Sequence, residues 1–474
     1  MTFALRPYSQ YMITDEPWLD SVPSHWKMVR TKSLLIERST KGFPNEPLLA
    51  ATQTKGVVRK EQYENRTVLA LKDLHLLKLV RVGDFVISLR SFQGGIEYAR
   101  EQGIISPAYT ILYPKDSQNH RYLSLMFKSK PYIENLTLHV TGIRQGQNID
   151  YVKLSRSALP LPPLDEQTAI VRYLDYVDRR IRRYIRAKQK LIRLLEEQKQ
   201  AIIHQAVTRG LDPDVRLKPS GVEWLGDVPE HWEVIKLGWL ISLVTGFPFK
   251  SDGFSINDSD IRLLRGINVS PSSIRWNSVV YWPERDLDTY SQFLLEVGDI
   301  VLGMDRPIIN NGMRVAIVSE KDVPSLLLQR VARIRCRSKL ESEYLMMIFN
   351  HKSFFDYLEP IFTGISVPHI SPDQIMSFKI AIPSFSEQRE ILKKVWEHIQ
   401  TISLKEEMAK KEIELLQEYR TRLITDVVTG KLDVRAAAAQ LPDEVEALLD
   451  EEDETQEEEA GLEAEDEAEG EDEE

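Results

Sequence analysis

The sequence holds almost no cysteine and no long apolar run. Cys336 is the only cysteine in 474 residues, which excludes an intrachain disulfide framework and a zinc site built from cysteines. No apolar run approaches the roughly 18 residues of a bilayer-spanning helix, and Met1 to Pro7 lack the apolar core of a secretory signal. We therefore expect a protein of the reducing cytoplasm with no membrane partner.

Sequence motifs of catalysis are missing as well. The chain has no glycine-rich phosphate loop ending in Gly-Lys-Ser/Thr and no Gly-x-Gly-x-x-Gly. It also lacks the Asp/Asn-Pro-Pro-aromatic motif of amino-methyltransferases, because Pro162-Pro163 is followed by Leu164. The nine histidines show no metal-like spacing, and Asp84 and Asp299 follow glycine at expected strand starts. We expect no catalytic residue, cofactor or metal ion on this chain.

Basic residues are absent from residues 443–474, which contain 20 acidic side chains. Because the whole chain carries −11 and this segment −20, residues 1–442 carry +9. The body of the protein is thus basic enough to meet a polyanion. We expect residues 431–474 to form a C-terminal extension with a disordered acidic tail.

The remaining sequence repeats itself in order. Trp18 to Trp26 (WLDSVPSHW) returns as Trp224 to Trp232 (WLGDVPEHW), 206 residues later. Two further phrases recur at offsets of 215 and 221 residues: VGDFV at 82–86 as VGDIV at 297–301, and PPLDEQ at 162–167 as PSFSEQ at 383–388. This indicates duplication of a unit of a little over 200 residues. A tryptophan phrase found in both halves is typical of packing between globule and helix.

Each repeat begins with a mixed region, residues 1–165 and residues 210–385. Short β-branched runs such as 84–88 and 315–318 predict strands, and residues 122–127 and 344–349 predict short helices. These regions are expected to be two similar α/β (α+β) globules.

Each repeat ends in a stretch almost free of glycine and proline, residues 166–209 and 386–430. Asp165 and Ser386 are the expected N-caps. Apolar residues recur at steps of four and three, including Tyr184 and Leu191, with interruptions at Lys188 and Gln198. The spacing predicts two helices of about 65 Å. They either pair as an antiparallel coiled coil with pseudo-twofold symmetry or pack separately on their own globules. Arginines 179, 180, 182, 183 and 186 form a solvated face or contact phosphate or a partner.

These motifs together resemble the specificity (S) subunit of type I restriction–modification systems over most of residues 17–433. LGDVPEHW at 225–232 resembles the opening of a target recognition domain, and PPLDEQ at 162–167 the transition into a conserved spacer helix. LRSFQGG at 89–95 with SPAY at 106–109 resembles one common first-domain type. GMDR at 303–306 with QRV at 329–331 resembles a common second-domain type.

The resemblance implies a non-catalytic, DNA-binding subunit that recognises a bipartite, asymmetric double-stranded target. The two globules would each read one half-site, and the helices would set the gap between them. Two methylation (M) subunits would bind the helices and methylate adenine from S-adenosylmethionine. Restriction (R) subunits would add cleavage that needs ATP and Mg²⁺. These cofactors are expected on the partners and not on this chain.

Base reading requires exposed donors and acceptors on loops, with arginine favouring guanine and asparagine or glutamine favouring adenine. The candidate DNA-binding residues of the first globule are Arg90, Gln93, Arg144, Gln145, Gln147 and Asn148. Those of the second globule are Arg306, Asn310, Asn311, Arg314, Gln329, Arg330, Ser366 and His369. Each could instead be a surface side chain or a phosphate contact. Two other functions stay open: a coiled-coil adaptor or structural protein, and a stand-alone DNA-modifying enzyme.

Overall fold

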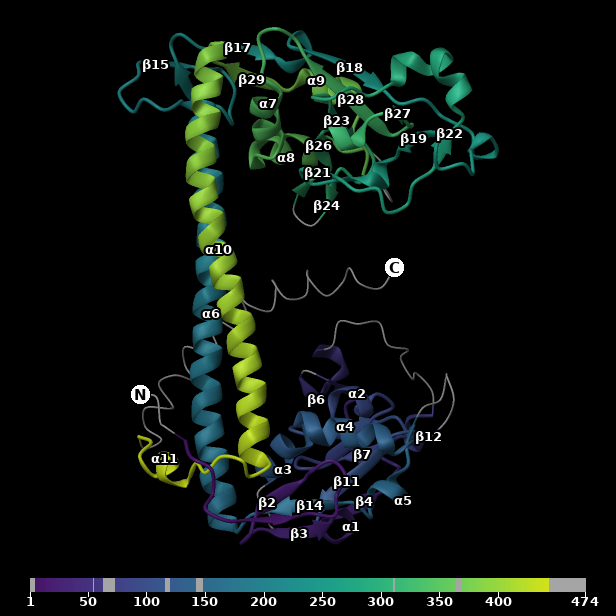
Figure 1. The fold of residues 1–474 in the computed structure, drawn as a ribbon, viewed down its shortest axis with the longest axis vertical. Helices are drawn as coiled ribbons and strands as arrows, with labels where there is room; N and C mark the ends of the chain where they lie inside the picture. The colour runs from purple at the N-terminus through teal and green to yellow at the C-terminus, as the bar shows by residue number, and fades with distance from the viewer. Residues whose placement is uncertain are drawn as a thin grey trace. The chain divides into compact units, whose positions relative to one another are not determined.

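The computed structural model describes residues 5–53, 55–62, 73–115, 120–141, 148–309, 312–363 and 368–442. The chain forms two compact units (Figure 1). The first unit comprises Met1–Gln189 together with Lys410–Glu474, and the second comprises Lys190–Ala409. Each unit therefore contains one globule and a part of both long helices. Among the described helices, none combines the length and the hydropathy of a membrane span.

Each globule is built around its own central sheet of four antiparallel strands. In the first, the strand order is β4 (Leu35–Arg38), β11 (Thr110–Pro114), β8 (Phe85–Ile87) and β9 (Glu97–Tyr98). In the second, it is β18 (Ile241–Thr245), β28 (Val331–Cys336), β23 (Ile300–Gly303) and β26 (Val315–Ile317). The predicted duplication and the mixed fold class are confirmed.

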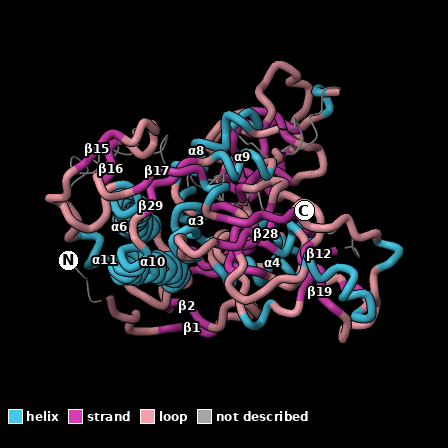
Figure 2. Tube along the Cα trace, turned by 90° about the horizontal axis from the view of Figure 1, so that it is seen from above, coloured by secondary structure: helices cyan, strands magenta, loops and turns pink. Residues whose placement is uncertain are grey.

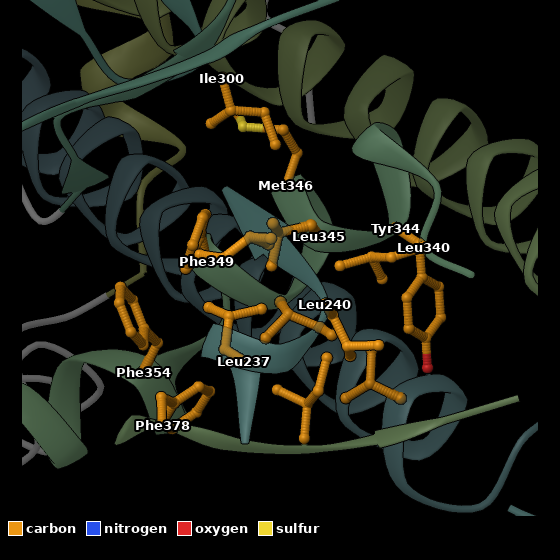
Figure 3. Close-up of a cluster of buried hydrophobic side chains, with 14 of the residues drawn as sticks. Leu237, Leu240, Ile300, Leu340, Tyr344, Leu345, Met346, Phe349, Phe354 and Phe378 are labelled. Atoms are coloured by element: carbon orange, nitrogen blue, oxygen red, sulfur yellow. The ribbon is translucent and has the colours of Figure 1, made fainter. Parts of the chain in front are cut away.

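Matching helices follow the sheets. The expected helices at 122–127 and 344–349 are α3 (His120–Phe127) and α7 (Ser342–Phe349). Each is followed by a second short helix, α4 (Lys130–Leu138) or α8 (Lys352–Leu358). In the second globule these helices meet the sheet in one apolar cluster, in which Tyr344, Phe349 and Phe378 are fully buried (Figure 3).

The repeats differ in what they add to this frame. The first globule adds the strand pairs β5 (Leu49–Thr52) with β6 (Gly56–Arg59), β7 (Lys78–Val80) with β10 (Gly103–Ile105), and β12 (Val140–Thr141) with β13 (Asn148–Ile149). The second adds the sheet β22 (Tyr281–Trp282), β19 (Ile261–Leu264) and β27 (Ser325–Leu327), and the pairs β20 (Val269–Ser270) with β21 (Ser273–Ile274) and β24 (Ile308–Ile309) with β25 (Gly312–Met313). The globules therefore share a core and differ at their edges.

A strand pair leads into each long helix. β3 (Lys27–Arg30) pairs with β14 (Ala158–Leu161), and β17 (Glu233–Lys236) pairs with β29 (Lys379–Ile382). The helices that follow are α6 (Leu164–Thr208) and α10 (Phe385–Val428), of 45 and 44 residues. Both begin before the expected N-caps. Asp165 lies inside the first turn of α6, and Ser384 rather than Ser386 caps α10, since its Oγ accepts from the Glu387 N–H at 3.3 Å.

Within each unit the two long helices lie side by side (Figure 2), and the chain runs along them in opposite directions (Figure 1). In the first unit Asp178 bonds Arg420, and Lys188 pairs with Glu412 at 2.6 Å. In the second unit Lys199 pairs with Glu406 at 3.0 Å. The antiparallel pairing expected from the apolar pattern is therefore confirmed.

The predicted apolar seam is only partly correct. Ile170, Leu174 and Leu195 are buried, whereas Tyr184 and Leu191 are 55% and 39% exposed. Lys188 lies between the two exposed residues and bonds across to Glu412, so ion pairing replaces apolar packing there. A straight helix also drifts relative to a 3.5-residue repeat, which turns later seam positions outward.

The repeated tryptophan phrase forms the junction between globule and helix. In the first unit the buried Glu166 carboxylate accepts hydrogen bonds from Tyr8 Oη at 2.7 Å and Trp26 Nε1 at 2.9 Å, and His25 Nε2 lies 2.7 Å away. In the second unit Glu387 accepts from Trp232 Nε1 at 3.0 Å and lies 3.1 Å from His231 Nε2. The packing role expected for this phrase is the one that the structure gives it.

The same tryptophans also contact the far end of the other long helix. A side chain on Gly430, after α10, would come within 3.1 Å of Trp26, and one on Gly210, after α6, within 3.1 Å of Trp232. Both glycines have positive φ, +78° for Gly430 and +73° for Gly210, which is the left-handed backbone common just after the C-terminus of an α-helix. Each tryptophan thus lies where one helix starts and the other ends.

Loss of the first junction carboxylate should cost more stability than loss of the second. Glu166→Ala leaves the buried Trp26 and Tyr8 donors without an acceptor, which should lower the free energy of unfolding of the first unit by about 3 kcal/mol. Glu387→Ala leaves one buried donor, Trp232, and should cost about 1–2 kcal/mol, because the Glu387 side chain is 27% exposed against 3% for Glu166 and water can reach the place of the lost acceptor. Denaturation followed by hydrogen exchange within each globule measures both losses; equal losses would contradict this account.

The second unit should lose stability in mild acid through His351. This residue is buried, its Nδ1 accepts from the Ser353 N–H at 3.2 Å at the start of α8, and its ring stacks on His204 of α6 at 5.1 Å. Burial lowers the pKa of His351 to about 4, and His204 acts in the same direction. The unfolded chain takes up this proton near pH 6.5, so the contribution is complete above pH 6.5 and is lost as the pH falls towards 4.

The expected loss over that interval is about 2–3 kcal/mol. His351→Asn keeps an N-cap acceptor without titrating and should flatten the pH profile. Thermal unfolding of the second unit between pH 4 and 7 measures the effect. An unchanged profile in the variant would exclude His351 as the titrating group.

Candidate nucleic-acid interface

The polar residues of the second globule gather where β23 ends. Gly303 is the last residue of this strand, and Met304-Asp305-Arg306 follow it. Backbone bonds fix this segment on two sides: Met304 N–H donates to Arg330 O at 2.9 Å, and Arg306 N–H donates to Pro368 O at 2.8 Å. Three segments far apart in sequence are thereby brought together, including the one that carries His369.

Asp305 lies at the centre of this group. His369 Nδ1 is 2.7 Å from its Oδ1, and Arg330 Nε lies 3.6 Å from its Oδ2. Arg330 is exposed and His369 partly exposed, so both side chains can meet a ligand while Asp305 orients them. The bond to Nδ1 leaves His369 Nε2 available to a ligand.

Two arginines of this group have left-handed backbones. The φ angles of Arg306 and Arg330 are +44° and +68°. Residues other than glycine rarely occupy this region, and where they do the position is frequently functional. Glycine would adopt this backbone at a lower free-energy cost, so both arginine side chains stand at positions that carry a conformational penalty. This observation favours a binding role for both.

Arg314 lies beside them just before β26. A side chain on Gly303 would come within 3.1 Å of Arg314 Cβ, so the two segments pass closely there. Burial and the nearby Arg306 lower the pKa of Arg314. Its Nε is buried and makes no hydrogen bond among the described residues. Arg306, Arg314 and Arg330 together form a cationic surface with one carboxylate, suited to a polyanion.

The remaining candidates of the second globule are only partly placed. Gln329 is exposed beside Arg330, and its N–H donates to Phe247 O at 2.9 Å. Asn310, Asn311 and Ser366 lie outside the described residues. Sequence reasoning did not name Asp305 as a site residue, although it lies inside the GMDR phrase.

In the first globule the equivalent strand end carries different side chains. β8 ends at Ile87 and is followed by α2 (Ser91–Gly94), which places Arg90 and Gln93 on the surface. Arg144, Gln145 and Gln147 lie outside the described residues, and of Asn148 only its backbone, at the start of β13, is described. Gln53, which the sequence reasoning missed, lies next to Gln93, with Nε2 3.5 Å from its Oε1.

Asp84 and Asp299 have the same structural task in both globules. Their carboxylates accept from the Arg81 and Glu296 N–H groups, each at 2.8 Å, and close the turns before β8 and β23. Across the described residues, no group of three or more histidine, cysteine or acidic side chains is arranged to hold a metal ion.

One frame built twice, with different polar side chains at the same strand end, defines a duplicated recognition module. The sequence profile of the family described as "Type I restriction modification DNA specificity domain" matches residues 23–192 and again residues 229–415. The chain belongs to this family, and each of its repeats carries one copy of the domain.

Named relatives agree with this assignment. The chain is 28% identical over 359 residues to the type I restriction enzyme MjaVIII specificity subunit of Methanocaldococcus jannaschii, covering 75% of this chain and 81% of that protein. It is 27% identical over 360 residues to the EcoAI specificity subunit of Escherichia coli, covering 60% of each.

A solved structure shares the fold. Its subject is complex assembly and conformational transition of the type I R-M system, and its chain aligns with a TM-score of 0.64 at 16% identity. The alignment covers 87% of this chain and 99% of that one.

Replacing Arg330 by glycine should weaken DNA binding without lowering the stability of the second globule. Glycine relieves the left-handed backbone, and the lost ion pair with Asp305 is exposed, so the free energy of unfolding should stay constant or rise by up to about 1 kcal/mol. Specific DNA binding should weaken by about 1–3 kcal/mol if Arg330 reads a base. Fluorescence anisotropy on specific and random duplexes measures this. An equal loss on both duplexes would make Arg330 a phosphate contact, and full affinity would exclude it.

Proposed function

We propose that this chain is the sequence-specific DNA-binding subunit of a type I restriction–modification complex. In this proposal it reads a bipartite, asymmetric double-stranded target and directs adenine methylation and restriction by partner subunits. The observation that carries the proposal is the contrast between constant frame and variable surface. The junction residues Trp26 and Trp232 bond equivalent glutamates, whereas the ends of β8 and β23 carry different polar side chains.

The two globules have the same sheet but different candidate DNA-binding side chains, and this supports two different half-sites. A symmetric target would be served by identical readers, and the first globule offers Arg90 and Gln93 where the second offers Arg306, Arg330 and His369. The long helices support a spacer function, since 45 and 44 helical residues correspond to about 68 Å and about 66 Å. In the proposal, their length sets the gap between the half-sites.

Exposed apolar side chains on α10 support partner binding. Trp396, Leu404 and Met408 are each about 60% exposed and lie on one side of the helix. We assign this side to the methylation subunits, two per complex, with restriction subunits completing the assembly. S-adenosylmethionine, ATP and Mg²⁺ would be bound by those partners, this chain would be non-catalytic, and the complex would work in the cytoplasm.

Co-expression with a methylation subunit tests the whole proposal. Mapping of N6-methyladenine in the host genome should show one split, asymmetric motif, and each strand should carry its methyl group in a different half-site. An adaptor protein would give no methylation motif. A stand-alone enzyme would methylate or cleave DNA without any partner, and either result would overturn the proposal.

Changing the length of both helices tests the spacer function separately from DNA reading. Removing seven residues from each helix at facing positions should keep both half-sites and change the number of bases between them. One heptad shortens the helix by about 10 Å, or about three base pairs. An unchanged gap would contradict the spacer function without touching the proposal that the globules read DNA.

A further inference from the structure

Two glutamines from separate segments meet on the surface of the first globule. Gln53 follows β5 in the β5–β6 hairpin, and Gln93 lies in α2, 40 residues later. Both are exposed, and Gln53 Nε2 approaches Gln93 Oε1 at 3.5 Å. This bond uses Gln53 Nε2 and Gln93 Oε1, and it leaves the side-chain oxygen Gln53 Oε1 and the side-chain amide group Gln93 Nε2 for a ligand.

An acceptor beside a donor matches the major-groove edge of adenine, which offers the N6 amino group and the N7 acceptor. Guanine offers two acceptors on the same edge and would leave the glutamine oxygen unpaired. The pair therefore has the chemistry of an adenine reader assembled from two segments.

Lys128 holds both segments in place. It follows α3, and its Nζ donates to Gln53 O at 3.1 Å, to Gly94 O at 2.8 Å and to Glu97 Oε1 at 2.6 Å. An ammonium group has three donors, and here each has an acceptor. One acceptor is the carbonyl of Gln53 itself, and another belongs to the residue after Gln93. The ammonium is thus used in bonds within the protein rather than offered to phosphate.

The surroundings of Lys128 are built for this contact. Glu97 of β9 is 2% exposed and belongs to the central sheet, so its carboxylate fixes the ammonium relative to the frame. Gly95 has a φ of +86°, and a side chain there would come within 2.3 Å of Phe127 O. A side chain on Gly94 would come within 2.7 Å of Gln53 Cγ. Both glycines allow the α2 segment to lie directly against the end of α3 and the hairpin.

We propose that Gln53 and Gln93 together read one adenine in the half-site of the first globule, with Lys128 as the positioning residue that holds the two glutamine-bearing segments together. This inference rests on the proposed function, because it names the base contact that the first recognition domain makes. It adds one reader and one positioning residue to the candidate site. The second globule has Asn350 at the position equivalent to Lys128, so the device belongs to the first globule only.

The test uses the full chain in complex with its methylation subunit, and the readout is the methylation motif together with binding to duplexes that carry each base at each position. Gln53→Ala and Gln93→Ala should relax the same single base pair of one half-site, each weakening binding to the preferred duplex about 10-fold. The double variant should be little worse than either single variant, because each glutamine depends on the other. Gln102→Ala removes a glutamine of the same globule that bonds Glu46 instead, and it should leave the motif unchanged.

Lys128 requires a variant that still folds. Burial raises the pKa of Glu97 to about 7, and Lys128 opposes this shift, so Lys128→Met alone leaves a buried carboxyl without its countercharge. Lys128→Met combined with Glu97→Gln removes both charges and should keep the fold. It should relax the same base pair as the glutamine variants, with the other half-site read at full strength.

Chemical rescue distinguishes positioning from a general loss of structure. Cys336 is the only cysteine of this chain, so Lys128→Cys in a Cys336→Ser background can be alkylated with 2-bromoethylamine before the methylation subunit is added. Alkylation restores an ammonium at nearly the original position and with it the countercharge of Glu97. Alkylation should restore discrimination at that base pair. An unaltered motif in the Gln53 and Lys128 variants would overturn this inference while leaving the proposed function intact, whereas a wild-type complex without any split motif would overturn the proposed function itself.

Discussion

In each unit, a carboxylate in the first turn of a long helix joins that helix to the globule before it. Glu166 and Glu387 each accept an indole N–H and lie beside an imidazole from the globule that precedes their helix. The helix N-terminus favours a negative charge at this place, so the globule and the helix are joined where their electrostatics agree. The same indoles lie against the glycines that end the opposite helices. Two helix termini and one globule thus meet at a single aromatic residue in each unit.

This junction explains why the surfaces of the globules can differ. The four-stranded sheets have the same strand order, and the turns before β8 and β23 are closed by equivalent aspartates. The large apolar cluster of each unit is built on its sheet. The strand ends are then free to carry Arg90 and Gln93 in one copy and Asp305, Arg306 and Arg330 in the other. Recognition can vary without any change to the parts that hold the chain together.

Much of the architecture could be predicted from the sequence because it was present twice. The repeated tryptophan phrase and the glycine-free stretches indicated duplicated globules and two long antiparallel helices. The helix starts were placed too late, since Ser384 caps α10 by a side-chain bond that spacing alone does not reveal. Tyr184 and Leu191 were assigned to the seam because a period does not show where Lys188 will pair across the helices.

The candidate site was less accessible to sequence reasoning. Residue type led to exposed arginines and glutamines, and the structure brings Arg306, Arg314, Arg330 and His369 together around one strand end. Asp305 was missed because its role depends on partners 25 and 64 residues away. Gln53 was missed because nothing in the hairpin sequence signals that α2 and the end of α3 lie beside it. Such contacts between distant segments follow from the tertiary fold and not from local pattern.

The first unit is assembled from both ends of the chain, and this has a consequence for its synthesis. Its apolar core joins Trp26 and Tyr122 with Leu423, Val428 and Leu441. On the ribosome, the amino-terminal globule is made first, but its core is complete only after residues 423–441 have been made, whereas residues 190–409 form a continuous stretch. The last-made globule therefore has the means to fold before the first-made one. A nascent chain cut short before residue 423 leaves the earlier globule with an open apolar face, which favours aggregation.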